Sequence, residues 1–148
     1  MSITEFRPPR IAMAFVLVAI GFHWVVPEWG RFHTHPWFGI SLGIIGFAVM
    51  MWGWRLFKKH DVAICPSSVT ASLITHSIYQ VSRNPMYLGL TLMLLGLALY
   101  MGTLPFYFAA IAYFAVINWG FCPYEEAKLA STFGQEYLNY KGRVRRWL

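Results

Sequence analysis

Two stretches of the sequence hold the side chains that could carry out chemistry. The first, residues 73–89, contains Arg83, and the second, residues 123–147, opens with Glu125 and Glu126. An arginine can clamp a carboxylate or a phosphate through two parallel hydrogen bonds. A carboxylate can bind ribose hydroxyls, an ammonium or a sulfonium, or it can accept a proton. Together these groups suit a zwitterionic nucleotide with a cationic sulfur, such as S-adenosylmethionine.

Aromatic side chains accompany both stretches and could stack on an adenine ring or face a cation. They are Tyr79, Tyr87, Phe133 and Tyr137. The polar groups also have ordinary structural interpretations. Arg83 could be a basic anchor beside a membrane, Asn84 and Pro85 are typical of a helix start, and the two glutamates would suit a helix N-terminus. Residue types alone therefore leave binding and structure both open.

The composition indicates that these stretches belong to a membrane protein. Hydrophobic residues make up 57% of the 148 residues and charged residues only 12%. Soluble domains are usually about 45–50% apolar, with about 25% charged residues. A chain of this kind needs a bilayer to solvate its surface, and its length allows one domain over residues 1–148.

Four apolar runs predict transmembrane helices at about residues 11–26, 37–57, 86–101 and 104–121. A tight turn at Gly102 and Thr103 forces the last two into a helical hairpin, which brings the two polar stretches together. On the second helix, three glycines form a small-residue face against which a neighbour could pack closely. They are Gly39, Gly43 and Gly46.

Cys122 and Pro123 are expected to end the membrane part, and a C-terminal amphipathic cytoplasmic helix should follow. One stripe of this helix, at helical spacing, holds Glu126, Leu129, Phe133, Tyr137 and Tyr140. The predicted fold class is an all-α integral membrane protein with four transmembrane helices.

The basic residues indicate the topology. If the N-terminus is inside and the chain crosses four times, all of the 12 Lys and Arg residues except Arg31 lie on the cytoplasmic side. We therefore expect a multi-pass protein of the cell inner membrane with both termini in the cytoplasm. The net charge of +6 flanks apolar runs, so the expected partner is the lipid bilayer and not nucleic acid. The oligomeric state is not indicated.

No metal site is predicted, since His33 and His35 form only a loose pair on a short loop. Cys65 and Cys122 are expected to be free thiols facing a reducing cytoplasm. His23 lies alone inside the first helix, where a polar group is often functional, although it could simply reach water from there.

The two stretches together resemble the signature of the isoprenylcysteine carboxyl methyltransferase and phospholipid methyltransferase superfamily. The pattern there is approximately Thr-x-Gly-x-Tyr, then Arg-His-Pro-x-Tyr-x-Gly. This chain has Thr75, Ser77 and Tyr79, then Arg83, Asn84, Pro85, Tyr87 and Gly89. The second half is matched by Glu125, Glu126, Leu129, Phe133, Gly134, Glu136, Tyr137, Tyr140, Arg143 and Val144. Serine replaces the usual glycine, asparagine replaces the common histidine, and the proline that often follows the valine is missing.

The resemblance, which covers residues 73–147, implies an integral membrane methyltransferase that uses S-adenosylmethionine. Its acceptor would be a lipophilic or small molecule with a carboxylate, thiol or amine. Catalytic roles would fall to Arg83 and to Glu125, which would be the base that an amine acceptor needs. The cofactor-binding residues would be Thr75, His76, Ser77, Tyr79, Arg83, Asn84, Pro85, Tyr87, Gly89, Glu125, Glu126, Leu129, Phe133 and Tyr137.

Two alternatives remain open at this point. Sterol reductases have a similar signature but bind a nicotinamide cofactor, and the basic cluster expected for its 2′-phosphate is not obvious here. The chain could also be a non-enzymatic membrane component that keeps the fold as an assembly or sensing module.

Overall fold

The computed structural model describes residues 8–59 and 72–148, and these two ranges contain helices and one isolated bridge but no strand. The all-α prediction is therefore confirmed. The elements are α1 (Pro8–His23), η2 (Glu28–Gly30), α2 (Pro36–Lys59), η3 (Ser77–Gln80), α3 (Pro85–Met101), α4 (Leu104–Val116), η4 (Ile117–Phe121), α5 (Cys122–Phe133) and α6 (Gln135–Arg143).

Two helices in the described ranges are long and apolar enough to cross a membrane. They are α2 and a 30-residue helix, Leu104–Phe133, in which α4, η4 and α5 run on continuously. The other two apolar helices, α1 and α3, have 16 and 17 residues. At about 1.5 Å per residue they are somewhat shorter than a hydrocarbon core of about 30 Å. Four crossings therefore stay a prediction.

The point at which the membrane part is predicted to end, Cys122 and Pro123, is not an end of the helix, which continues through both residues to Phe133. A proline inside a helix lacks an N–H and its ring clashes with the preceding turn. Here the turn before it widens into the π-helix η4, where the Cys122 N–H bonds to the Ile117 carbonyl. Glu125 therefore sits inside a helix and not at a free helix N-terminus.

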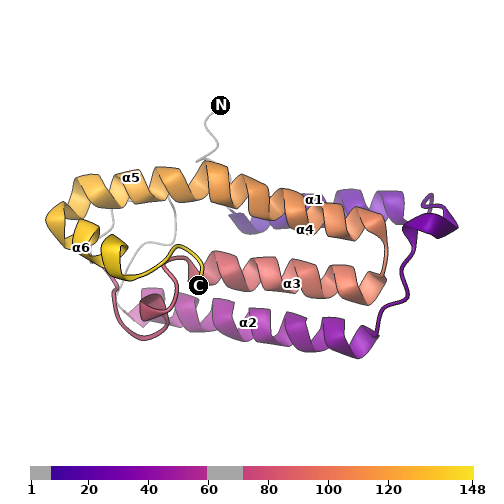
Figure 1. The fold of residues 1–148 in the computed structure, drawn as a ribbon, viewed down its shortest axis with the longest axis horizontal. Helices are drawn as coiled ribbons and strands as arrows, with labels where there is room; N and C mark the ends of the chain where they lie inside the picture. Colours follow the sequence, from indigo (N-terminus) through magenta and orange to yellow (C-terminus); the bar gives the residue numbers. More distant parts are fainter. Residues whose placement is uncertain (1–7, 60–71) are drawn as a thin grey trace.

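The helices form a bundle in which α3 lies between α2 and α4, and α1 packs on α4 (Figure 1). The predicted α3–α4 hairpin is confirmed, and it turns at Gly102, whose φ of +62° is unfavourable for residues with a Cβ. At this turn the Phe32 N–H donates to the Gly102 carbonyl at 2.7 Å. The loop after α1 is thus attached to the end of the bundle that lies farthest from α5 and α6 (Figure 1).

The predicted C-terminal amphipathic helix is two helices, because the chain bends at Gly134, where φ is +53°. Helix α6 folds back beside α5 (Figure 1). The predicted stripe faces inward: Tyr137 and Tyr140 are buried against η3 and the residues before it. Packing of α6 against η3 and the residues before it therefore explains this stripe better than contact with a membrane surface does.

Glycines allow the backbones of α2 and α3 to touch. A Cβ built on Gly46 would lie 2.6 Å from the Gly89 carbonyl oxygen, and one on Gly39 would lie 2.6 Å from the Gly96 carbonyl oxygen. Such contacts occur where small residues let two helices approach closely. The predicted small-residue face of α2 is therefore a packing face. Gly89, which was expected at the cofactor site, packs against this face from α3.

We predict that Gly46→Ala destabilises the protein by about 1–3 kcal/mol, the usual effect of overpacking. The new methyl group would meet backbone atoms of α3, which cannot rotate away. Thermal unfolding in detergent would measure the change. Gly43→Ala is the matched control, because a Cβ there meets nothing within 4 Å. Equal melting temperatures for the two variants would contradict the close contact.

Candidate functional site

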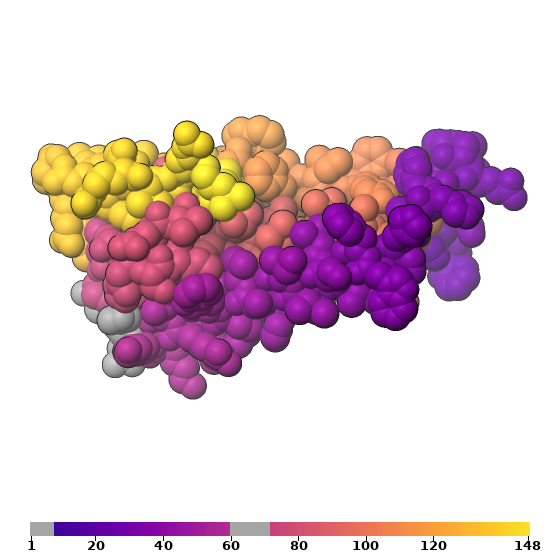
Figure 2. Space-filling model, turned by 60° about the horizontal axis from the view of Figure 1, so that its bottom comes forward, coloured from indigo at the N-terminus to yellow at the C-terminus, as the bar shows by residue number. Residues whose placement is uncertain are grey.

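The polar residues singled out from the sequence gather at one end of the bundle. Residues 72–84, α5, α6 and the chain after α6 meet there (Figure 1). In Figure 2 the C-terminal residues, in yellow, lie directly on the pink segment that precedes α3. The hairpin thus brings the two predicted stretches into contact.

The carboxylate of Glu126 lies at the centre of an ion cluster. It accepts from Arg146 Nε at 2.7 Å, lies 2.9 Å from Lys141 Nζ, and lies 3.3 Å from Arg83 Nη1. The side chains of Glu126 and Arg83 are each only 9% exposed. The hydrogen bond with Glu126 raises the pKa of the Arg146 guanidinium. Because three cations share one carboxylate, the cluster carries surplus positive charge.

Arg83 is fixed by its backbone as well as by its side chain. Its N–H donates to the Arg145 carbonyl at 3.1 Å, and its Nη1 donates to the Tyr137 hydroxyl at 3.1 Å. Its Nε is buried and has no hydrogen-bond partner among the described residues. A buried unpaired donor is uncommon. The guanidinium therefore retains capacity to bind an anionic group.

Glu125 has a different environment from its neighbour. Its carboxylate accepts a hydrogen bond from the Tyr87 hydroxyl at 2.6 Å. The two adjacent glutamates thus do different things: Glu126 is held by cations, and Glu125 is paired with a neutral phenol at the start of α3.

Residues 82–84 are attached to the chain that follows α6. Ser82 Oγ and Asn84 Nδ2 both donate to the Arg146 carbonyl, at 3.1 and 3.3 Å. Asn84 occupies the N-cap position of α3, but its side chain makes no capping hydrogen bond. The predicted helix start at Asn84 and Pro85 is therefore confirmed, but the Asn84 amide bonds to the tail and not to the first turn of α3.

Helix α6 anchors the segment before α3 through tyrosines. Tyr140 Oη donates to the Tyr79 carbonyl at 2.6 Å, and the ring of Tyr79 lies 5.6 Å from that of Phe57 on α2. Burial raises the pKa of both the Tyr79 and the Tyr140 phenols, so they stay neutral. Ser77, where the superfamily usually has glycine, has a φ of +60°, a conformation that glycine adopts without the strain felt by serine.

Two small cavities of about 90 and 70 Å³ adjoin these groups. Their shared walls are Phe57, Tyr79, Arg83, Asn84 and Glu125. Arg83, Glu125 and an aromatic wall therefore border both cavities, and Glu126 lines the larger of the two. This arrangement can hold a ligand that combines negative charge, positive charge and a flat ring.

Most of the predicted site residues come together here. Those that line the cavities are Tyr79, Arg83, Asn84, Pro85, Tyr87, Glu125, Glu126, Leu129 and Tyr137. Thr75, His76, Ser77, Gly89 and Phe133 do not line them. Phe133 instead packs against the buried tyrosines of α6.

Several contributors were missed by the sequence interpretation. In the sequence, Phe57 is one of many apolar residues and Lys141 one of many basic residues, so nothing indicated that they belong to the site. Arg146 counted only as one of the cytoplasmic basic residues. Asn118 could have been found, because a polar side chain inside the apolar run 104–121 is costly in a membrane and is often functional.

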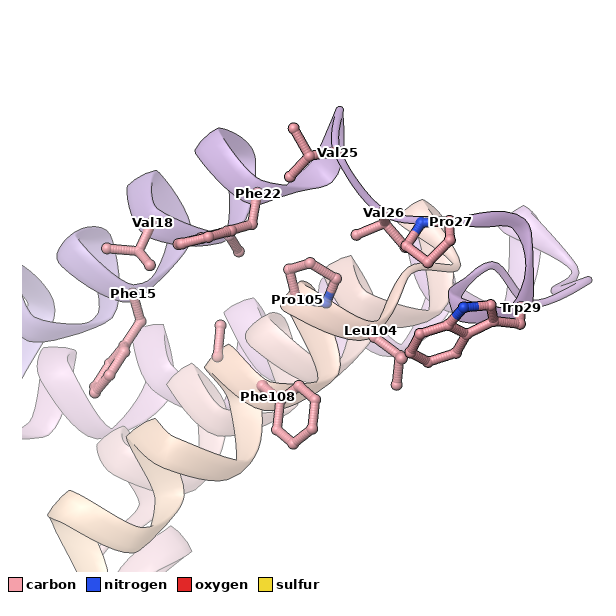
Figure 3. Close-up of a pocket in the computed structure, with 12 residues that line it drawn as sticks. Phe15, Val18, Phe22, Val25, Val26, Pro27, Trp29, Leu104, Pro105 and Phe108 are labelled. Carbon is pink, nitrogen blue, oxygen red and sulfur yellow. The ribbon is translucent and has the colours of Figure 1, made fainter.

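A larger cavity, of about 400 Å³, lies at the other end of the bundle between α1 and α4. Figure 3 shows its walls, which include Phe15, Phe22, Val26 and Phe108. No titratable side chain lines it. This cavity suits hydrocarbon but offers no group for catalysis.

The remaining isolated signals have structural explanations in the described ranges. His23 Nδ1 lies 3.0 Å from the Thr103 hydroxyl, so the histidine ties α1 to the α3–α4 turn. Cys122 is a buried free thiol, whereas Cys65 lies outside the described residues. No group of three or more His, Cys, Asp or Glu side chains that could hold a metal ion is found in the ranges that the structure describes.

A helical hairpin joining two polar segments is the arrangement expected of the methyltransferase superfamily whose signature the sequence resembles. Residues 34–136 match the phospholipid methyltransferase family, and the chain belongs to this family. The match includes Arg83, Glu125 and Glu126 but not the tail that carries Arg146.

Two relatives match parts of the chain. Protein-S-isoprenylcysteine O-methyltransferase B of Arabidopsis thaliana is 38% identical over 76 residues, which are 49% of this chain and 36% of the plant protein. An uncharacterized protein of Haemophilus influenzae is 44% identical over 63 residues, which are 43% of this chain and the whole of that protein. No solved structure matches. The family and the plant relative indicate a methyltransferase.

We predict that Glu126→Gln destabilises the protein by about 3–5 kcal/mol, the usual effect of removing one partner of a buried ion pair. The substitution leaves the buried Arg83 guanidinium without its carboxylate. Chemical unfolding in detergent would measure this. The control is Glu136→Gln on the exposed side of α6, which should change stability by less than about 0.5 kcal/mol. A similar small loss in both variants would show that the cluster contributes little.

Proposed function

We propose that this chain is an integral membrane methyltransferase that moves a methyl group from S-adenosylmethionine to a lipophilic or small acceptor at the cytoplasmic face. The observation that carries the proposal is the juxtaposition of the Arg83–Glu126 cluster with the Glu125–Tyr87 pair around shared cavities. Family membership supports the reaction class.

The groups around the cavities fit the charges of this cofactor. The surplus positive charge near Glu126, together with the unpaired Nε of Arg83, suits a carboxylate. Glu125 suits an ammonium or a sulfonium, and the rings of Phe57 and Tyr79 suit an adenine. Each cavity is smaller than the roughly 300–1,000 Å³ of most small-molecule sites. Binding must therefore join them across the side chains that they share.

The proposed chemistry asks little covalent work of the protein. S-adenosylmethionine supplies a methyl group that its sulfonium already activates. The chain must align the acceptor with it and exclude water. A carboxylate or thiolate acceptor needs no base. For an amine acceptor, Glu125 would take the proton, since it lines both cavities and accepts its hydrogen bond from the neutral Tyr87 hydroxyl, whereas Glu126 is bound by three cations.

The surface of the bundle supports a site at a membrane face. Trp24, Trp29 and Trp37 are 79%, 77% and 77% exposed, which is typical of rings in an interfacial belt and not of a soluble surface. All three lie toward the end that carries Arg31, opposite the candidate site (Figure 1). These exposed rings support the proposal of a site on the basic, cytoplasmic side of an inner membrane that the chain would cross four times.

The proposed topology predicts that reporters placed at residue 33 and at residue 148 lie on opposite sides of the membrane. Four crossings put the loop after α1 and the tail on opposite sides of the membrane. The positive-inside rule then requires the loop to be outside and the tail to be inside. Phosphatase and fluorescent-protein fusions at the two positions would measure this. Reporters on the same side would contradict the four-helix arrangement.

Arg83 gives the most direct test of cofactor binding. Calorimetry on purified Arg83→Ala should show S-adenosylmethionine bound about 2–5 kcal/mol more weakly, because a buried charge pair is lost. Arg83→Lys should recover only part of this, since lysine lacks the two-pronged geometry. The exposed Arg143→Ala serves as the control.

Glu125→Gln provides the comparison for chemistry. Glutamine can still accept the hydrogen bond from Tyr87, so the fold should persist, while transfer to an amine acceptor should fall about 10²-fold.

Unchanged cofactor affinity in folded Arg83→Ala would contradict the proposed carboxylate contact. Failure of the unmodified protein to bind S-adenosylmethionine would contradict the function itself.

A further inference from the structure

We infer that Asn118 and Arg146 are positioning residues for the candidate site, acting through a clamp in which the tail after α6 is held to the π-helix of the fourth apolar run. The part of this inference that concerns cofactor binding rests on the proposed function. Its structural part rests on contacts between η4, Glu126 and residues 145–147. The match to the family ends at residue 136, so these tail residues are not assigned by it.

Because Pro123 has no N–H, it leaves a backbone carbonyl of the same helix available as an acceptor for the clamp. In η4 the Cys122 N–H bonds to the carbonyl five residues earlier, that of Ile117. The next bond in the same register would join residue 123 to the Asn118 carbonyl, but proline has no N–H. The Asn118 carbonyl is therefore left for another donor, and a partly buried carbonyl without one would be destabilising.

Arg146 supplies that donor. Its Nη1 lies 3.1 Å from the Asn118 carbonyl oxygen and 3.2 Å from the Asn118 side-chain oxygen Oδ1. Its Nε donates to Glu126 Oε1 at 2.7 Å. One guanidinium thus spans the π-helix and the carboxylate eight residues further along the same helix, using its planar fork in a way that lysine cannot reproduce.

Trp147 completes the clamp from the adjacent position. Its Nε1 donates to the same Asn118 Oδ1 at 3.0 Å, and its ring lies 5.0 Å from the ring of Phe114. The Asn118 side chain therefore accepts from two consecutive tail residues. The orientation of the amide is set by these donors, because both require the oxygen and not the NH₂ group.

The clamp reaches Arg83 by two routes. Through its side chain, Arg146 fixes the Glu126 oxygen that Arg83 contacts at 3.3 Å. Through the backbone, the carbonyls of Arg145 and Arg146 accept from the Arg83 N–H and from Ser82 Oγ. The guanidinium proposed to bind the cofactor is consequently located by the tail, and the tail is located by Asn118.

The test compares Asn118→Ala with Asn139→Ala, which removes an exposed amide from α6. In the unliganded full chain, hydrogen exchange at the amides of residues 82–84 should become about ten-fold faster in Asn118→Ala only, the scale set by loss of hydrogen bonds to a charged group. Calorimetry should show about ten-fold weaker binding of S-adenosylmethionine. Asn118→Asp, which keeps an oxygen acceptor, should restore both.

A double substitution separates positioning from general stability. If Asn118 acts through Arg146, Asn118→Ala should have no further effect on affinity in an Arg146→Ala background, although each single change weakens binding. Unchanged exchange in Asn118→Ala, or failure of aspartate to restore affinity, would overturn the inference. If the unmodified protein does not bind the cofactor, the proposed function fails, and the exchange measurement still decides whether the clamp positions residues 82–84.

Discussion

The Glu126 carboxylate is the group on which the arrangement of the site depends. It joins α5 to the segment before α3 through Arg83, to α6 through Lys141, and to the tail through Arg146. Each of these cations belongs to a different part of the chain, and each would be repelled by the others without the shared anion. The location of Arg83 beside the cavities therefore follows from a single negative charge.

The length of the helix that carries Glu126 explains how a polar cluster coexists with an apolar bundle. At about 1.5 Å per residue, the 30 residues of Leu104–Phe133 extend for about 45 Å, more than a hydrocarbon core of about 30 Å. The last turns can thus stand clear of lipid. A break at Pro123 would have ended the helix before the glutamates and left them without a fixed direction, and the wider turn of η4 avoids this break.

Much of the site was predictable because its two halves are local in sequence and are joined by one short turn. Once residues 86–101 and 104–121 are recognised as a hairpin, Arg83 and Glu125 must lie at the same end. The use of Asn84, the bend at Gly134 and the continuation through Pro123 were not predictable in this way. Each depends on a tertiary contact or on a helix distortion that overrides the usual preference of the residue.

The same reasoning explains the division between the two glutamates. The sequence predicted both near Arg83, and it assigned the catalytic role to Glu125 by resemblance and the aromatic stripe to Glu126, but it could not show which carboxylate faces the cation. The structure separates them by their partners, cations for Glu126 and a phenol for Glu125. Only side-chain packing distinguishes such a pair.

The order of groups along the chain has a consequence for biosynthesis. The glycine contacts between α2 and α3 involve residues that leave the ribosome early, so this helix pair can associate while later helices are still being made. Arg146 follows every other contributor to the ion cluster in the sequence. Until it is synthesised, Glu126 and Arg83 lack their common support. The helix pair can therefore form before the ion cluster is complete, and the synthesis of Arg146 determines when the cluster is complete.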